Sequence, residues 1–383
     1  MKTRRSFYRY SILFIFLIIN YAAESQDKKP IVKDITHELQ VSETTTLDID
    51  YSTDLPALSP TIDDHFEIFT WDKPLVKRIV TVEVVPINHS EALKFIEHLE
   101  FTELKETPVE VSIDLACGIR LIHAERKEWV VTMKDETEYK IGSYQLKFTI
   151  YVPEDIQLNL KSNHSKISLG RLTNKARINL RSAALKANSI NELDLNARSS
   201  TIQVNGINDG VLKLWHCEMA SENIGNIRII ETAHCNYDLG EVKDLKIVKS
   251  KEDEFIIKRV RNLESSSSVF TNFYISHLEN RLEQAGENGD VIIDQLSSGF
   301  DDIRIDNTFS IIRIGLAENP GIVLDTHTSL TEIFLDRNFK ATTLSPDEKL
   351  RNSDYSRKRY FIGSKDAKSN IRIDCKQCEI HVK

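Results

Sequence analysis

A repeat of about 18 residues constrains this chain more than any other feature of its sequence. From residue 156 onward, an apolar residue that opens a strand, called position zero, recurs once in every repeat at a nearly constant spacing. A fixed period of this kind indicates a solenoid, in which stacked repeats bury a continuous core. The residues at position zero are Ile167, Leu185, Ile202, Met219, Tyr237, Phe255, Phe273 and Val291.

The apolar spacing inside each repeat predicts strands. Apolar residues recur two residues after position zero, and a spacing of two places side chains on one face of a strand. The further step of three, to plus five, marks a bend between two flat sides. A helix would require apolar spacings of three and four, which the repeat lacks. The plus-two residues are Leu169, Ala187, Val204, Ser221, Leu239, Ile257, Ile275 and Ile293, and the plus-five residues are Leu172, Ile190, Ile207, Ile224, Val242, Val260, Leu278 and Leu296.

We therefore predict an all-β fold, a single-stranded parallel β-solenoid (β-helix) with inward columns at position zero, plus two and plus five. Its coils stack at about 4.8 Å. A further column is expected seven residues before position zero, at Leu160, Ile178, Leu195, Leu212, Ile230, Val248, Ser266 and Gln284. Short polar side chains at plus seven predict a turn, because they bond the local backbone; they are Asn174, Glu192, Asp209, Asn226, Asp244, Asn262, Asn280 and Ser298.

The predicted organisation has four parts. Residues 1–25 form a signal peptide, 26–155 an N-terminal capping region, 156–338 the regular solenoid and 339–383 an irregular loop with closing strands. A cap is expected because the first coil otherwise exposes an unpaired edge.

Two local patterns fill in the capping region. Phe66, Ile68 and Trp71 have the spacing of an early coil. Asn88 with Glu91 resembles a capping box and predicts one short helix over 90–99, with Leu93, Ile96 and Leu99 on one face. The closing strands are expected at Ile371, Ile373, Ile380 and Val382.

The first residues have the pattern of an export signal. Basic residues precede an unbroken apolar stretch from Ile12 to Ile19, and Ala23 with Ser25 predicts cleavage before Gln26. The alternative, a retained anchor, is disfavoured because a membrane-spanning helix needs about 20 apolar residues. We expect export to the periplasm, the outer-membrane surface or the extracellular space, with no membrane span left after cleavage.

Net charge limits the partners. The chain has 50 basic and 58 acidic residues, and removal of the leader leaves 46 and 57, a net charge of about −11. This acidic balance argues against nucleic acid and anionic lipid as partners. Five cysteines are too few for a disulfide scaffold, so the core must come from apolar packing.

One pair of dipeptides is a candidate metal site. His216-Cys217 and His234-Cys235 are one repeat apart and so occupy equivalent positions in adjacent coils. Two histidines and two cysteines are able to bind zinc tetrahedrally. The alternatives are a disulfide between the cysteines and the packing of small residues in a tight turn, and we rank packing first.

Cys375 and Cys378 form a CxxC motif near the end of the sequence. Redox catalysis by this motif requires a βαβ setting that the pattern lacks, so we expect a disulfide that fixes the last strand. Cys117 has no predicted partner.

No residues are predicted as catalytic or cofactor-binding, and no cofactor is expected. Acidic doublets such as Asp63-Asp64 and Asp301-Asp302 are typical of solvated turns. Two classes of function stay open. The first is a non-catalytic envelope scaffold or adhesin that binds a protein or glycan partner. The second is a carbohydrate-active β-helix enzyme, either a polysaccharide lyase or a hydrolase.

Two segments of this chain resemble a known family. Residues 66–76, followed by a valine-rich strand and the Ser90-Glu-Ala-Leu helix, are similar to the start of the bacterial "putative adhesin" β-solenoid domains. Residues 144–169 resemble their entry into the regular coils. The resemblance implies an exported bacterial envelope protein. The chain departs from the family in the turn before position zero, where Ser165, Ala183, Ser200, Cys217 and Cys235 replace glycine.

Overall fold

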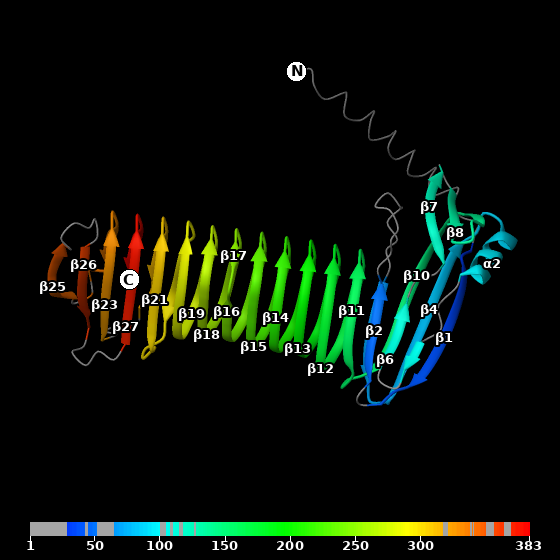
Figure 1. Ribbon diagram of the computed structural model, residues 1–383, viewed down its shortest axis with the longest axis horizontal. Coiled ribbons are helices and arrows are strands. Elements are labelled where there is room, and N and C mark those ends of the chain that lie inside the picture. The colour runs from blue at the N-terminus through cyan, green and yellow to red at the C-terminus, as the bar shows by residue number, and fades with distance from the viewer. Residues whose placement is uncertain are drawn as a thin grey trace, which may run out of the picture.

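The computed structural model confirms a nearly all-β protein with a parallel β-solenoid of about nine turns and coils of about 18 residues. The coils stack along the long axis of the molecule, and the N-terminal strands and the helix lie at one end (Figure 1). The predicted leader, residues 1–25, lies outside the described residues. The structure describes residues 29–42, 45–51, 65–99, 105–107, 110–114, 118–125, 128–316, 321–337, 339, 341–349, 356–363 and 369–383.

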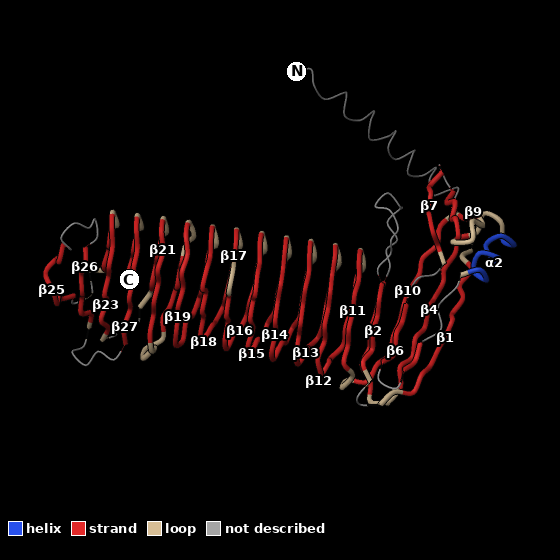
Figure 2. Tube along the Cα trace, in the orientation of Figure 1, coloured by secondary structure: helices blue, strands red, loops and turns tan. Residues whose placement is uncertain are grey.

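Each regular coil pairs in parallel with the next, so that Ile167 lies beside Leu185 and Leu185 beside Ile202. Strands account for almost all of each coil, with short loops at the tips and a break between β16 and β17 (Figure 2). The strands of these coils are β11 (Gln157–Asn163), β12 (Lys166–Arg181), β13 (Ala184–Arg198), β14 (Thr201–Trp215), β15 (Glu218–Ala233), β16 (Asn236–Ile247), β17 (Ser250–Lys251), β18 (Glu254–Val269) and β19 (Asn272–Glu287).

The three inward columns predicted from the repeat form the core. Every residue at position zero, plus two and plus five is at most 5% exposed. Within the position-zero column, the ring of Phe255 stacks on Tyr237 at 4.3 Å between centroids and on Phe273 at 5.1 Å. Because parallel coils place like residues directly above one another, the repeat itself produces this aromatic stack.

The column predicted seven residues before position zero is wrong for the three coils after Leu212. A β-bulge makes Leu212 pair with Ile229, and Ile230 is the extra residue. The buried column therefore continues through Ile229, Ile247 and Ser265 before it returns to the predicted Gln284, whereas the predicted residues Ile230, Val248 and Ser266 are half-buried or exposed. Because a shift of one residue turns a side chain to the opposite face of a strand, one bulge is enough to change the column.

The turn predicted at plus seven is found at Ser298, but at the other seven positions the chain stays in extended strands. Asn174 Oδ1 accepts from the adjacent backbone N–H of Lys175 at 2.8 Å, whereas other polar side chains of this column bond to one another across coils. The Asn226 amide donates to Asp209 Oδ1 at 2.7 Å, Asn262 donates to Asp244 Oδ1 at 2.6 Å, and Asn280 donates to Asn262 Oδ1 at 2.9 Å. This column is a row of inter-coil hydrogen bonds on the surface.

The capping region joins the solenoid through two parallel strands. β2 pairs with β11, and β3 pairs with β12, where Phe66 lies beside Ile167 as the early-coil pattern predicted. Antiparallel strands cover the outer side, since β10 pairs with β4, and β4 with β1. The strands are β1 (Ile31–Gln40), β2 (Thr46–Tyr51), β3 (His65–Trp71), β4 (Leu75–Val85), β5 (Lys105–Thr107), β6 (Glu110–Asp114), β7 (Ile119–Glu125), β8 (Glu128–Met133), β9 (Glu138–Ile141) and β10 (Ser143–Pro153).

The predicted helix is present as α2 (His89–His98), which packs on β9 and β4. Its cap differs from the predicted box. Asn88 Oδ1 accepts from the backbone N–H of Ser90 at 2.9 Å, but Glu91 accepts from Lys140 N at 2.8 Å and so ties the helix to β9. Leu93, predicted on the buried face, is 40% exposed.

The distal end departs from the order of the sequence. The C-terminal strand β27 pairs in parallel with β21 on one side and with β23 on the other, and β28 pairs in the same way with β22 and β24. The predicted boundary of 156–338 is therefore wrong at its distal end. Strands from residues 369–383 are inserted between coils of this range, which is not continuous by itself. Figure 1 shows the red C-terminal strand between yellow and orange ones. The strands are β20 (Val291–Leu296), β21 (Asp302–Thr308), β22 (Ile311–Ile314), β23 (Ile322–Ser329), β24 (Glu332–Leu335), β25 (Ala341–Lys349), β26 (Ser356–Ile362), β27 (Ser369–Lys376) and β28 (Glu379–Val382).

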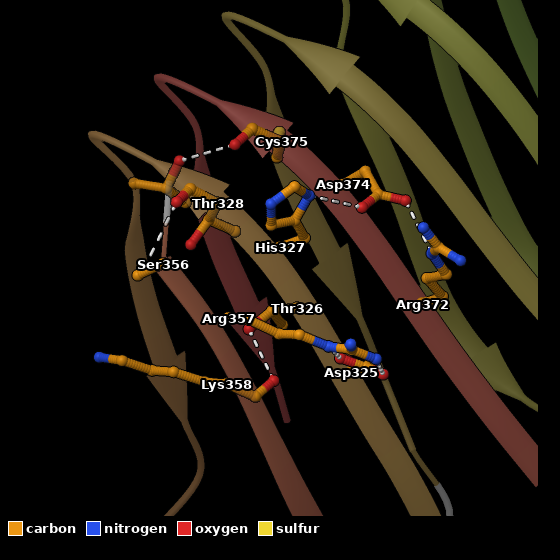
Figure 3. Close-up of polar contacts among 11 residues, drawn as sticks. Asp325, Thr326, His327, Thr328, Ser356, Arg357, Lys358, Arg372, Asp374 and Cys375 are labelled. Atoms are coloured by element: carbon orange, nitrogen blue, oxygen red, sulfur yellow. Dashed lines mark hydrogen bonds and ion pairs between the residues drawn. The ribbon is translucent and has the colours of Figure 1, made fainter. Parts of the chain in front are cut away.

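An ion-pair network holds the antiparallel strand β26 on β23. Arg357 makes two hydrogen bonds to the carboxylate of Asp325, from Nε at 3.2 Å and from Nη2 at 2.7 Å (Figure 3). Arg359 Nη2 donates to the same carboxylate at 2.7 Å. Hydrogen bonds from Arg357 and Arg359 lower the pKa of Asp325 to about 2, although partial burial acts in the opposite direction. The carboxylate is therefore ionised at any ordinary pH.

We expect the contribution of Asp325 to depend on pH. Its pKa is lower in the folded state than in the unfolded chain, so its stabilisation is complete above about pH 4 and is lost as pH falls toward about 2. Asp325→Asn should therefore increase hydrogen exchange in β26 at neutral pH, and the difference from the wild type should vanish near pH 2. Asp306→Asn, an exposed residue on β21, is the control. A difference that persists unchanged at low pH would contradict this.

Candidate functional site

The sharp corner of every coil is a residue in the left-handed region, three residues before position zero. None of these residues is glycine, although a left-handed residue with a Cβ costs about 1–2 kcal/mol. They lie in a row along one edge of the solenoid, at the tips in Figure 2. With φ between 49° and 56°, they are His164, Ser182, Ser199, His216, His234, Glu252, Phe270, Asn288, Phe309, Leu330 and Gln377.

Each corner leaves one backbone N–H that the parallel ladder does not use. His216 N donates to Ala233 O at 2.9 Å, and Glu218 N donates to Ser200 O at 3.0 Å, in the coils on either side. The N–H between them, that of Cys217, donates to the side chain of Cys235 at 3.3 Å. The residue after the corner thus accepts a hydrogen bond from the preceding coil.

This requirement explains which residues occupy the column. Ser200 Oγ accepts from Ala183 N at 3.2 Å, and Asp253 Oδ1 accepts from Cys235 N at 2.7 Å. A buried N–H without a partner costs about 1–3 kcal/mol, so small side chains that accept hydrogen bonds are favoured here. Serine, cysteine, aspartate and threonine meet this need without the glycine that the resemblance led us to expect.

The structure places the thiols and the imidazoles of the candidate metal site on opposite sides of the chain. Cys217 and Cys235 are 2% and 1% exposed and unbridged. The rings of His216 and His234 lie outside, stacked at 4.7 Å, and His234 Nδ1 pairs with Glu252 at 3.1 Å. The four side chains therefore do not converge on one point. Across the described residues, no group of three or more metal-ligating side chains is present.

The thiol of Cys235 is held protonated. Its hydrogen bond with the Cys217 sulfur and its burial raise its pKa, and its Sγ donates to Ala233 O at 3.3 Å. The adjacent Asp253 carboxyl is 2% exposed. Burial raises the pKa of Asp253, although four hydrogen bonds from Cys235, Thr232, Ser250 and Lys251 favour its ionised form. These contacts are structural, because solvent does not reach them.

The remaining predicted residues lie apart from this cluster. Cys375 and Cys378 are joined by a disulfide across the corner between β27 and β28, with 6.2 Å between their Cα atoms. Asp302 pairs with Arg304 at 2.6 Å, while Asp301 is exposed beside a turn. Cys117 and the Asp63-Asp64 doublet lie outside the described residues.

A groove of about 720 Å³ crosses the coils on the face formed by the residues on either side of plus five. The groove begins at Arg171 and ends at Glu279, and it runs across the strands. Its walls come from the columns at plus four and plus six, and its floor from the backbone at plus five. The plus-four residues are Arg171, Ser189, Gly206, Asn223, Glu241 and Arg259, and the plus-six residues are Thr173, Asn191, Asn208, Gly225, Lys243, Arg261 and Glu279.

Small residues create the hollow. Ser189, Gly206 and Gly225 occupy successive coils in the middle of the groove. Because their side chains are small or absent, the groove walls are low there. Gly225 has no freedom to change, because a Cβ there would lie 2.3 Å from Asn208 O. Sequence reasoning missed this site because it searched for columns of one charge, whereas the signal is a loss of side-chain volume at plus four and plus six.

The groove has a neutral centre and charged ends. Amides of Asn191, Asn208 and Asn223 line the centre. At the end nearer the C-terminus, Arg259 Nη1 pairs with Glu279 at 3.2 Å. An exposed, hydrogen-bonding trough of this kind is suited to a polar ligand, and none of its described lining residues is aromatic.

Comparisons with known proteins do not assign a family. No family model matches the chain, and no curated protein matches it. One solved structure, described as a "putative cell adhesion protein" from Clostridium sporogenes, is similar over 93% of this chain and 99% of its own length, at 10% identity and a TM-score of 0.19. A TM-score this low does not establish a common fold, so the candidate site depends on the geometry of this chain alone.

Among the residues with described positions, no helix is both long enough and apolar enough to cross a membrane.

Proposed function

We propose that this protein is a non-catalytic, exported, adhesin-like β-solenoid that holds an extended glycan in the groove across its coils. The observation that carries the proposal is the groove itself, a polar trough of about 720 Å³ that runs perpendicular to the strands. Export rests on the leader-like segment at positions 1–25 of the sequence. The partner class rests on the spacing of the groove walls.

The spacing favours a glycan over a peptide. The walls repeat once per coil, about every 4.8 Å. An extended peptide presents side chains to one face every two residues, or about 6.7 Å, so it loses register with the coils after one or two contacts. A linear glycan repeats once per sugar ring, a length close to the coil spacing. Each ring is therefore able to meet one plus-four and one plus-six position of the groove walls.

The positions of the carboxylates favour binding without catalysis. Glycosidases place two carboxyl groups about 5–9.5 Å apart. Glu241 and Glu279 belong to coils two steps apart, and Arg259 of the coil between them pairs with Glu279 at 3.2 Å. The Glu279 carboxylate therefore already has a partner within the protein. A carbohydrate-active enzyme remains the alternative that the experiment below must address.

The test fills the groove without disturbing the fold. At Gly206 a Cβ would have Ser189 Cβ, at 3.4 Å, as its nearest neighbour, and this is an ordinary contact. We expect Gly206→Trp to keep the wild-type free energy of unfolding within about 1 kcal/mol. The same substitution should abolish binding on an array of bacterial envelope glycans, because the indole occupies the path of the ligand.

The matched control is Asn196→Trp, an exposed position in the neighbouring coil on a face away from the groove. It should bind as the wild type does. Equal binding by Gly206→Trp and the wild type would show that the groove is not the site. Release of reducing ends or unsaturated products from any bound glycan would overturn the non-catalytic assignment in favour of the lyase or hydrolase alternative.

A further inference from the structure

We infer that the ligand of this groove is a linear acidic glycan that bears carboxylates, an inference that rests on the proposed function and names its ligand class. The observation is a local reversal of charge. The chain as a whole has a formal net charge of −8. The groove is lined by four cationic side chains, Arg171, Lys243, Arg259 and Arg261, and by two carboxylates, Glu241 and Glu279.

Two of the arginines differ from the other cations in their contacts. Arg259 is paired with Glu279 at 3.2 Å, and Lys243 lies 3.9 Å from Asp244. Arg171 and Arg261, the other two cations of the groove, make no side-chain hydrogen bond or ion pair with any described residue. Unpaired guanidinium groups at both ends of a groove favour an anionic ligand.

The geometry indicates a long ligand with spaced charges. Arg171 and Arg261 belong to coils five steps apart, so their backbones are separated by about 24 Å. Between them, three successive coils present neutral groups, and the coil of Glu241 and Lys243 carries one charge of each sign. Asn208 Nδ2 donates to Asn191 Oδ1 at 3.3 Å, which aligns the amides of adjacent coils along the groove. A polymer with hydroxyl groups throughout and carboxylates at intervals matches this order of contacts.

Arginine also favours a carboxylate over a dispersed charge. The planar guanidinium donates two parallel hydrogen bonds to a carboxylate, and such pairs are stronger than neutral hydrogen bonds. Among the described residues of the groove wall, Glu241 is the one unpaired carboxylate, and it lies two coils from the last lining residue, Glu279. The Glu241 carboxylate would repel a ligand carboxylate placed beside it. The groove therefore disfavours a polymer that is charged on every ring and favours acidic units separated by neutral ones.

The experiment compares matched pairs of glycans that differ only in charge. The probes are linear oligomers of galacturonate, of mannuronate and of the alternating disaccharide of hyaluronan, each with its carboxyl methyl ester. We expect the alternating hyaluronan oligomer to bind at least tenfold more tightly than its ester by calorimetry at low salt, with affinity falling as salt rises, and the oligomers charged on every ring to bind more weakly than it does. Arg171→Gln and Arg261→Gln should each weaken that binding about tenfold.

Arg177→Gln is the control, because it removes the same charge from a different face and should leave affinity unchanged. The outcomes separate the two claims. If the esters, or neutral glycans from the array, bind as tightly as the acids and Gly206→Trp blocks them, the acidic class is overturned and glycan binding stands. If none of these glycans binds, the proposed function falls with it.

Discussion

Replacement of Ile257 by aspartate is expected to unfold the solenoid. Ile257 is fully buried in the plus-two column, between Leu239 and Ile275 of the adjacent coils. An aspartate there would be a buried charge with apolar neighbours above and below it. The expected loss exceeds about 4 kcal/mol, which approaches the total stability of many domains. Circular dichroism during urea unfolding measures it.

Lys258→Asp is the matched control for this change. Lys258 is the next residue on the same strand, and its side chain is exposed on the opposite face. We expect a change in the free energy of unfolding within about 0.5 kcal/mol. Equal losses in the two variants would mean that the register of the inward columns is wrong.

Replacement of Asp253 by alanine should have the next largest effect. The Asp253 carboxylate accepts from Cys235 N at 2.7 Å and from Lys251 N at 3.0 Å, two backbone donors beside the corners of adjacent coils. It also accepts from Ser250 Oγ at 2.6 Å. The loss of these bonds leaves buried donors without partners, which destabilises the fold, while removal of a buried charge partly offsets that loss. We expect the free energy of unfolding to fall by about 3 kcal/mol.

The control for Asp253→Ala is Asp238→Ala, which removes an exposed carboxylate from the neighbouring coil. Thermal unfolding of the two variants at about pH 7 should give clearly separated midpoints. Similar midpoints would show that the corner N–H groups do not need side-chain acceptors. The same comparison explains the His-Cys dipeptides, whose cysteines stand in the column of Asp253.

The inward columns could be predicted because each of them repeats many times. The same reasoning from periodicity failed where a single inserted residue changes which side chains face the core. Ile229 and Ile230 are both isoleucine, so composition does not tell which of them faces the core after the bulge. The corners were placed correctly before position zero, but their conformation was not foreseen. A left-handed residue is usually glycine, whereas here serine, histidine and phenylalanine adopt it in turn.

The groove and the order of the distal strands could not be predicted for different reasons. The hollow at Gly206 exists because outward-facing side chains there are small or absent. The pattern of inward-facing apolar residues carries no information about the size of outward-facing side chains. Ile371 and Ile373 fit the repeat as well as any other coil does. Their place between β21 and β23 depends on contacts far apart in the sequence, which periodicity does not contain.

The inserted C-terminal strands determine when the molecule is able to finish folding. As the chain is made, the coils up to β22 can stack in the order in which they appear, since each new strand finds its neighbour already in place. β23 and β24 have no such partner waiting, because the sites beside β21 and β22 belong to residues 369–383. The distal end therefore closes only after residues 369–383 have been made. A chain that stops early keeps an open sheet edge, which exposes it to aggregation and to proteases.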